Sequence, residues 1–331
     1  MNFTADLHAH IALPEKEPSD EQIKAKLNAY KETGVTYLRD GGDNCGASLK
    51  AKKFAEELGL DYVTPGFAIY KEDHYGSFLG KSFKTFDEYK ALVDEAEKEG
   101  ADFIKLMLSG IIDFDEYGVI KDGRYQYKVI DVEEITVPEI SCDDDDDDHD
   151  HHEHEHPSAE DGSHNFVATV YKKDESIFEQ EELNEMVEYA HSKGFSVMAH
   201  ANGAANIKAA LLSGVDSLEH GYYIDEECAS MLAESDTVWV PTVAPVAALV
   251  GNDDYNQEVL KKVIADHIKM INRVWYLGGM IGLGTDAGSV GTEHVKAIDS
   301  EYNFLKAAIN DQEFDVHLET TLAQVQWKFK K

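Results

Sequence analysis

The sequence predicts a single (β/α)₈ barrel, and three observations support this fold class. Short apolar runs of β type alternate with amphipathic helical runs along nearly the whole chain of 331 residues. Glycine ends several of the predicted helices, where a left-handed residue commonly closes a helix. Eight such strand–helix units in a chain of this length fit a closed barrel better than an open sheet. The glycines are Gly34, Gly59, Gly100, Gly194 and Gly214.

Eight apolar runs have the length and composition of barrel strands. They cover residues 3–8, 35–39, 61–67, 102–108, 195–200, 216–220, 237–242 and 280–285. Helical patterns lie between and after them, at 20–33, 47–58, 86–99, 179–193, 204–212, 225–233, 255–277 and 294–308. Each predicted strand is therefore followed by a predicted helix, which is the repeat of a parallel barrel.

The connection between the fourth and fifth predicted strands is much longer than the others. We assign residues 122–178 to an inserted, hairpin-like arm with β-like segments at 125–137 and 165–171. Its low-complexity tip, residues 141–164, carries eleven acids and no Lys or Arg, so we expect a solvated insertion that packs no core. The tip also has the side chains that bind Zn, Ni or Cu weakly. Its histidines are His149, His151, His152, His154, His156 and His164.

Composition excludes several functional classes. A formal net charge of −35 repels nucleic acid and anionic membranes, so neither is an expected partner. The sequence contains no run of about twenty apolar residues, so no transmembrane helix is predicted. The start MNFTADLHAH does not resemble a secretory signal. Three scattered cysteines argue against a disulfide framework and favour a cytoplasmic protein. The expected partner is a small-molecule substrate, and a homo-oligomer is compatible with the sequence.

Candidate metal ligands gather at the predicted C-terminal ends of the strands, where barrel active sites lie. His8 and His10 are two residues apart in the first strand, so they point together into the barrel. His200 ends the fifth strand, His220 the sixth and Asp286 the eighth. Each alone is more often structural than functional, but the set suits Zn²⁺, with Mn²⁺, Co²⁺, Fe²⁺ or Ni²⁺ as substitutes.

Lys105 lies in the fourth predicted strand, on the interior face with Phe103 and Met107. A bare buried ammonium is expensive, so burial should lower the pKa of this lysine and make the neutral amine available. A neutral amine can react with carbon dioxide to form a carbamate, an anionic oxygen ligand able to bridge two metals. The alternative is a lysine whose ammonium reaches solvent at the barrel mouth.

Five segments resemble the amidohydrolase superfamily. DLHAH, FIKLMLSG, VMAHANG, SLEHG and GLGTDAG occur in the order of that family, on the strands where the family places them. The set is most similar to the imidazolonepropionase-like and prolidase-like branches, which pair an FIK-type lysine with EHG and GTDAG segments. The resemblance implies a metal-dependent hydrolase that cleaves a C–N bond in an amide, a cyclic amide or a peptide.

The resemblance further implies a centre with two divalent metal ions. The implied ligands are His8, His10 and Asp286 for one metal, His200 and His220 for the other, and a carboxylated Lys105 that bridges them. In the implied mechanism, a metal-bridging hydroxide attacks the scissile carbonyl. Asp286 accepts the hydroxide proton and delivers it to the leaving nitrogen, so it acts as base and then as acid.

Candidate substrate contacts lie in the loops that follow the strands, where an ordinary loop residue is an equal alternative for each. They are His74, Tyr75, Tyr222 with its neighbour Tyr223, and His294. Arg39 ends the second predicted strand. We expect it to form an internal ion pair with Asp40 or Asp43, and a substrate carboxylate is the alternative partner.

The sequence departs from the family pattern in three places. Relatives commonly carry a small β-sandwich on either side of the barrel, for which this chain has no room, so we expect a barrel-only member or incomplete boundaries. The tail DVHLETTLAQVQWKFKK lacks the usual Asn-Pro-containing helix. The segment SGIIDFDEYG replaces a common Gly-Gly pair, and the acidic, His-rich arm is additional.

Two other functions remain as alternatives. One is a metal-binding or metal-buffering protein on a catalytically inactive barrel, with the arm as its functional part. Against it, an inactive barrel would often have lost Asp286 or Lys105, since neither is needed for folding. The other is a mononuclear deaminase, and Lys105 discriminates here because such relatives do not need a bridging lysine. Substrate identity lies in the loops and is not readable from one sequence.

Overall fold

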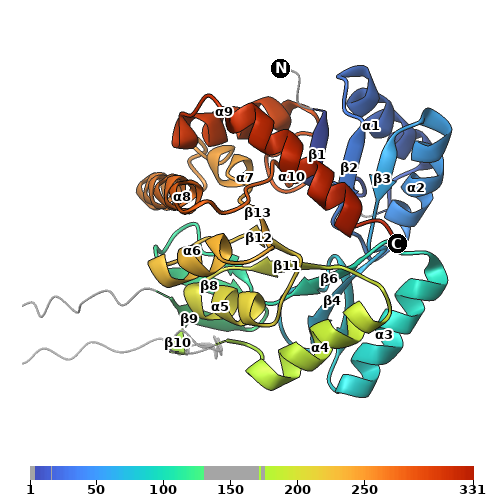
Figure 1. Cartoon of the computed structure of the whole chain (residues 1–331), viewed down its shortest axis with the longest axis horizontal. Helices are drawn as coiled ribbons and strands as arrows, with labels where there is room; N and C mark the ends of the chain where they lie inside the picture. Colours follow the sequence, from blue (N-terminus) through green and yellow to red (C-terminus); the bar gives the residue numbers. More distant parts are fainter. Residues whose placement is uncertain (1–3, 16, 130–170, 173–175) are drawn as a thin grey trace, which may run out of the picture.

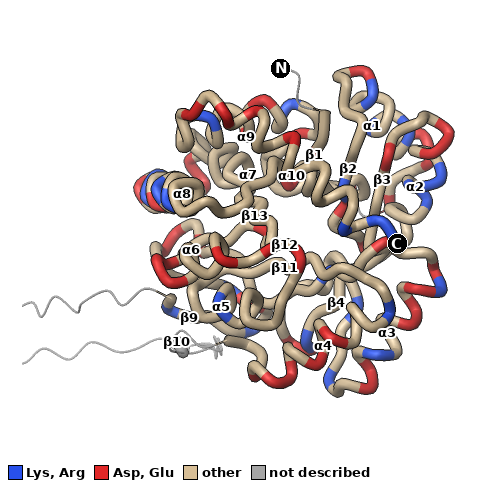
Figure 2. Tube along the Cα trace, viewed as in Figure 1, with Lys and Arg blue, Asp and Glu red and all other residues tan. Residues whose placement is uncertain are grey.

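The computed structural model describes residues 4–15, 17–129, 171–172 and 176–331 (Figure 1). Parallel strands form an inner wall, and helices cover its outer side. Acidic and basic residues are interspersed along the outer helices (Figure 2). No helix in the described ranges is long and apolar enough to cross a lipid bilayer.

Two parallel sheets make up the wall. The first contains, in order, β1 (Ala5–Ala9), β2 (Tyr37–Asp40) and β3 (Asp61–Val63). The second contains, in spatial order, β13 (Val238–Val240), β12 (Ser217–His220), β11 (Val197–Ala201), β6 (Ile104–Met107), β4 (Ala68–Lys71) and β5 (Gly80–Phe83). Six of these nine strands are buried along their whole length, because a parallel sheet inside a helical layer is covered on both faces.

Backbone hydrogen bonds join the two sheets on both sides. The amide of Asp102, just before β6, donates to the Thr64 carbonyl, just after β3, over 2.9 Å. On the opposite side, residues 280–285 lie between β13 and β1, where the amide of Leu7 donates to the Leu283 carbonyl over 2.9 Å. The pairing order therefore returns to its start, as the predicted barrel requires.

Two predicted strands are shorter than expected. The run 61–67 ends as β3 at Val63, because Pro65 has no amide to donate and Gly66 takes a positive φ of 72°. Residues 280–285 form only isolated bridges to their neighbours. Glycine is the reason there too. A side chain at Gly284 would come within 2.8 Å of His8, so the backbone of this segment lies too close to β1 for any residue with a side chain, and a regular set of strand hydrogen bonds is not formed.

The helices follow the predicted order, and neighbouring helices pack around the wall from α1 to α9. The bounds of eight of them lie within about two residues of the predicted ones, which is the usual spread at helix ends, whereas the short helix at Ala244–Ala247 was not predicted. Two short capping motifs start α1 and α3, where Ser19 and Thr85 accept a hydrogen bond from the third helical amide. The helices are α1 (Asp20–Glu32), α2 (Ala47–Leu58), α3 (Phe86–Glu99), α4 (Gln180–Ser192), α5 (Ala204–Leu212), α6 (Glu226–Ala233), α7 (Ala244–Ala247), α8 (Gln257–Leu277) and α9 (Lys296–Ile309).

A small separate sheet with the order β10-β9-β8-β7 lies where the inserted arm leaves the barrel. Its strands are β7 (Ile111–Ile112), β8 (Val119–Asp122), β9 (Tyr125–Lys128) and β10 (Tyr171–Lys172). At the described ends of the arm, β9 pairs in parallel with β10 and antiparallel with β8, so the predicted hairpin pairing is not seen between residues 125–128 and 171–172. Residues 141–164 lie outside the described residues.

The C-terminal tail forms a helix that was not predicted, α10 (Phe314–Lys328). It lies across one end of the barrel (Figure 1). Phe329, just after it, is fully buried and packs edge-on against Phe103, with ring centroids 5.3 Å apart. Together with Val325 it joins an apolar cluster of interior residues that includes Leu7. The end of the barrel that faces α10 is therefore a packed core of apolar side chains, with the guanidinium of Arg39 4.4 Å above the Phe329 ring.

Candidate active site

A cavity of about 350 Å³ opens at the C-terminal ends of the wall strands. Five of the six predicted metal ligands line it: His10, Lys105, His200, His220 and Asp286. The sixth, His8, is fully buried just beneath, within 3.6 Å of His10, Lys105 and Asp286. The fold thus brings all six to one place, from strands far apart in the sequence.

His8, His10 and Asp286 form the tightest group in the cavity. One ligand atom from each lies within 4.8 Å of the other two. The Nε2 atoms of His8 and His10 are 3.3 Å apart, and Oδ1 of Asp286 lies 3.6 Å from the first and 3.4 Å from the second. Burial is the main reason that the pKa of His8 lies well below its usual value, so this imidazole is neutral.

Hydrogen bonds behind the two rings determine which nitrogen faces the group. Nδ1 of His8 is 2.6 Å from a carboxylate oxygen of Glu219, and Nδ1 of His10 is 3.2 Å from the carbonyl oxygen of Gly42. These oxygens accept, so each Nδ1 carries the proton and each Nε2 presents a lone pair. Two lone pairs and the Asp286 carboxylate repel one another unless a cation lies among them. The three residues therefore fit a divalent metal.

Glu219 was not among the predicted site residues, although it stands beside His220 in the chain. Its second oxygen accepts a hydrogen bond from Nη2 of Arg39 over 2.9 Å, and both side chains are fully buried. The predicted pairing of Arg39 with a neighbouring aspartate is therefore wrong, as is the alternative of a substrate carboxylate. The guanidinium crosses the barrel interior because β2 and β12 both turn these residues inward. The chain Arg39–Glu219–His8 fixes the first imidazole.

Lys105 is 1% exposed, and its Nζ lies 3.4 Å from Nε2 of His8. Burial lowers the pKa of this amine to about 8, with the nearby carboxylates of Glu219 and Asp286 partly opposing the shift. The predicted alternative, an ammonium that reaches solvent, does not match this burial. A neutral amine is thus accessible at ordinary pH, and it faces the same space as the histidines.

His200 and His220 form the other side of the centre, with ring centroids 4.6 Å apart. Nε2 of His200 donates to the Gly110 carbonyl over 3.0 Å, which leaves its Nδ1 as the lone-pair nitrogen. Nδ1 of His220 lies 2.7 Å from the hydroxyl of Thr242. Burial lowers the pKa of His200 to about 4, so this ring is also neutral and can bind a metal.

Irregular backbone brings several of these groups inward. The register of β1 against β2 shifts between Asp6 and Ala9, which lets Leu7 join the interior core while His8 still reaches the centre. His220 and Asp286 take positive φ angles of 66° and 52°. Such conformations are strained for side-chain-bearing residues and are typical of functional sites.

Asp6 anchors the segment that carries Asp286. Its carboxylate accepts hydrogen bonds from the Thr285 amide over 3.0 Å and from the Thr285 hydroxyl over 2.6 Å, and it is fully buried. Burial raises the pKa of Asp6 to about 6 despite these bonds. The DLHAH and GLGTDAG segments are therefore hydrogen-bonded directly to each other. Asp6 positions Asp286 through Thr285 and does not itself line the cavity.

The predicted substrate contacts divide into two groups. Tyr75 and Tyr222 line the cavity, and the Tyr75 ring lies 5.5 Å from that of His200. His74 does not line it: its Nδ1 is 2.6 Å from Asp122, outside the cavity. His294 is also turned away, with Nε2 3.0 Å from the Leu13 carbonyl. Tyr223 likewise does not line it, and its hydroxyl accepts a hydrogen bond from the Gly118 amide.

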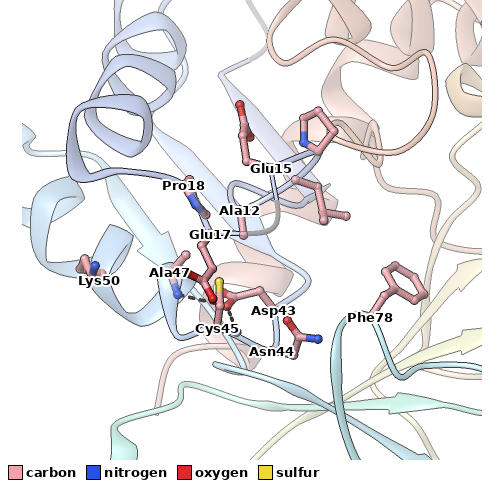
Figure 3. A pocket seen from close by; sticks show the side chains of 12 residues that line it. Ala12, Glu15, Glu17, Pro18, Asp43, Asn44, Cys45, Ala47, Lys50 and Phe78 are labelled. Carbon is pink, nitrogen blue, oxygen red and sulfur yellow. Dashed lines mark hydrogen bonds between the residues drawn. The ribbon is translucent and has the colours of Figure 1, made fainter.

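A second hollow of about 900 Å³ lies next to this cavity and shares Leu13, Pro14 and Phe78 with it (Figure 3). It is larger, but it contains none of the predicted ligands. Its most buried acid, Asp43, accepts hydrogen bonds from the amides at the start of α2, the shortest over 2.6 Å from Ser48. Asp43 therefore stabilises a helix end, and the smaller cavity, which holds the predicted ligands, is the candidate active site.

Comparison with known proteins shows the family to which the chain belongs. The chain matches the amidohydrolase family over residues 5–313. A stretch of 122 residues is 34% identical to ochratoxinase from Aspergillus niger, and it covers 34% of this chain and 25% of that protein. The matched stretch thus spans about a quarter of the curated relative.

Solved structures share the fold at low sequence identity. The crystal structure of A. niger ochratoxinase superposes with a TM-score of 0.69 and 17% identity, over 100% of this chain and 72% of that one. A Xaa-Pro dipeptidase with bound methionine gives 0.63 and 20%, over 96% and 75%. A putative prolidase from Bifidobacterium longum gives 0.65 and 18%, over 96% and 67%. The predicted family is confirmed: this chain belongs to the amidohydrolase family.

Proposed function

We propose that this chain is a metal-dependent hydrolase that cleaves the C–N bond of an amide, cyclic amide or peptide in a small molecule. One observation carries the proposal: the lone pairs of His8 and His10 and the carboxylate of Asp286 converge within 4.8 Å in a buried cavity. Family membership supports a hydrolase, and the names of the relatives, ochratoxinase and Xaa-Pro dipeptidase, favour amide and peptide bonds.

The chain offers ligands for two divalent ions, of which zinc suits the donor set best. His8, His10 and Asp286 would hold one, His200 and His220 the other, and Lys105, converted to a carbamate, would lie between them. The neutral form of Lys105 needed for that reaction is favoured by its burial. When bound, such ions lower the pKa of water and polarise a carbonyl group.

The remaining chemistry falls to side chains of the chain itself. Asp286 is 15% exposed and faces the cavity, so its carboxylate can accept a proton from the attacking water and return it to the leaving nitrogen. Glu219 and Arg39 hold the ring of His8 in place. Apolar residues around the cavity exclude bulk water, which strengthens every electrostatic contact inside it.

A chelation and reconstitution experiment tests the proposal. The purified chain would be treated with a mild chelator, then assayed against anilides, acyl-amino acids, dipeptides and lactams before and after addition of zinc. We expect amide hydrolysis that needs the added metal and disappears in Asp286→Asn. Ammonia release from nucleobase-like rings without amide cleavage would favour the deaminase instead. Tight metal binding with no hydrolysis in any class would favour a metal-buffering protein.

A further inference from the structure

The wall of the cavity above the candidate metal centre is apolar on nearly every side. It is built from residues of several elements and the loops between them, including β7 and α7. Leu13, Met107, Ile112, Val246 and Leu249 all line it and are at most partly exposed. A substrate that reaches Asp286 must therefore place the group beside its scissile bond against hydrocarbon.

Two polar side chains of the wall, Tyr222 and Asn202, are already engaged within the protein. The Tyr222 hydroxyl donates to the Thr242 carbonyl over 2.8 Å, and the Asn202 amide group donates to the Gly110 carbonyl over 3.0 Å. The side-chain oxygen of Asn202 in turn accepts a hydrogen bond from the backbone N–H of Tyr222. These groups bind one another, so they contribute shape rather than a binding position for a charge.

Among the described residues that line the cavity, no lysine or arginine lies outside the candidate metal centre. Lys105 is the only lysine or arginine among the lining residues, and it lies at the floor. Lys26, close to the Leu13 side, is held by two backbone carbonyls and by Glu15.

The described residues that line the adjoining hollow include more acids than bases. Glu15 and Glu17 line it, as Figure 3 shows. Its lysine, Lys50, forms an ion pair with Asp20 over 3.1 Å. Among its described residues, the hollow therefore supplies no lysine or arginine that is free of an acidic partner.

We propose, on the basis of the hydrolase function above, that this site selects uncharged amides with an apolar or aromatic group beside the scissile bond. Compounds with a free carboxylate next to that bond, such as dipeptides and acyl-amino acids, are disfavoured. A carboxylate in this cavity would lose its water without gaining a hydrogen-bonded cation, which is costly for a buried charge. A carboxamide has nearly the same shape and avoids most of that cost.

The test compares benzoyl-glycyl-phenylalanine with its C-terminal carboxamide on the full chain loaded with zinc. Both contain the same Gly–Phe bond and differ in one charge. We expect kcat/KM for the carboxamide to be at least about tenfold higher. Binding of the same pair is measured by calorimetry on the protein with Asp286→Asn, so that the preference is read without turnover.

A substitution in the wall supplies the matched control. Ile111 lines the cavity and is only partly buried, so a longer side chain can be accommodated. Ile111→Lys should shift the preference toward the free acid by about tenfold, whereas Ile111→Gln, which is polar but uncharged, should not. Thermal unfolding of both variants checks that the barrel is intact.

The outcomes separate the two proposals. If neither compound is hydrolysed but the carboxamide binds better, the hydrolase function fails and the selectivity stands. Equal values for the pair, a preference of the unmodified site for the acid, or no binding of either compound would overturn the selectivity.

Discussion

The two halves of the candidate metal centre are supported by different kinds of neighbour. His8 is held by a buried ionic chain, in which Glu219 bonds the ring over 2.6 Å and Arg39 bonds Glu219 over 2.9 Å. His200 and His220 are held by neutral partners, a backbone carbonyl and the hydroxyl of Thr242. Charge-assisted hydrogen bonds are about twice as strong as neutral ones.

Under the proposed two-metal centre, this difference makes the two metal positions unequal. A carboxylate behind His8 makes its Nε2 a better donor and fixes the ring, whereas a carbonyl or hydroxyl does less of both. The half with His8, His10 and Asp286 should therefore hold its metal more tightly. The half with His200 and His220 should lose its metal first when the protein is dialysed against a chelator.

The largest effect is expected for Asp286→Asn. Asparagine keeps the shape but cannot accept a proton, so kcat should fall by about 10²–10⁴-fold, as is typical when an acid–base group is removed. His8 and His10 remain, so part of the metal should be retained. Steady-state kinetics and elemental analysis on the same sample measure both. Activity within a factor of about three of the parent protein would contradict the role of Asp286.

Glu219→Gln should have the next largest effect, on the tighter metal. The amide cannot replace a carboxylate behind His8, so affinity should fall by about 10–100-fold, the usual range for such supporting residues. Competition with a chromophoric chelator measures this directly. Because Glu219 also neutralises buried Arg39, thermal unfolding of the metal-free proteins must be recorded alongside. An unchanged affinity would show that the ionic chain is structural only.

Thr242→Val is the matching change in the other half. It removes the hydroxyl that bonds Nδ1 of His220 and keeps the side-chain volume. One neutral hydrogen bond is worth about 1 kcal/mol, so affinity for the weaker metal should fall only about fivefold. The same chelator competition is used. If Thr242→Val weakened binding more than Glu219→Gln, the proposed inequality of the two halves would be reversed.

The smallest effect concerns Glu301, which supports the backbone next to Thr242. Its buried carboxyl accepts hydrogen bonds from the Val243 and Ala244 amides over 3.0 and 2.7 Å. Burial raises the pKa of Glu301 to about 8 from its usual 4.5. The unfolded chain ionises first, so stability should fall as pH rises from about 4.5 to about 8.

Glu301→Gln removes that ionisation. The Tm of the parent protein should therefore drop relative to the variant by about 2 °C or more between pH 5 and 8, both measured without metal. A constant difference across this range would mean that Glu301 is ionised in the folded protein.

The positions of the candidate ligands were predictable because each lies at the end of a strand that the sequence itself marks. A strand-end histidine or aspartate is readable from the alternation of strands and helices, and all six predicted ligands meet in the structure. The helix order was predictable for the same reason, since Gly and capping residues mark helix ends. The assignment of metals, carbamate and proton transfer to these residues remains a proposal.

Contacts across the barrel were not predictable in the same way. Arg39 and Glu219 are 180 positions apart in sequence, and their meeting depends on which residues of β2 and β12 face each other across the interior. Regular alternation places Glu219 inward, but then turns His220 outward. The positive φ of His220 resolves this, and no sequence signal announces it. The turn of His74 toward Asp122 likewise depends on a register between loops.

The most direct test of the central claim is the metal content of the full chain and of Lys105→Ala after mild chelation, with Lys71→Ala as a control. Lys71 is half-buried and pairs with Glu182, away from the cavity, and all three proteins carry the same arm. We predict about two tightly bound zinc ions in the parent and control, and about one fewer in Lys105→Ala. The same metal content in all three proteins would contradict a centre bridged by Lys105.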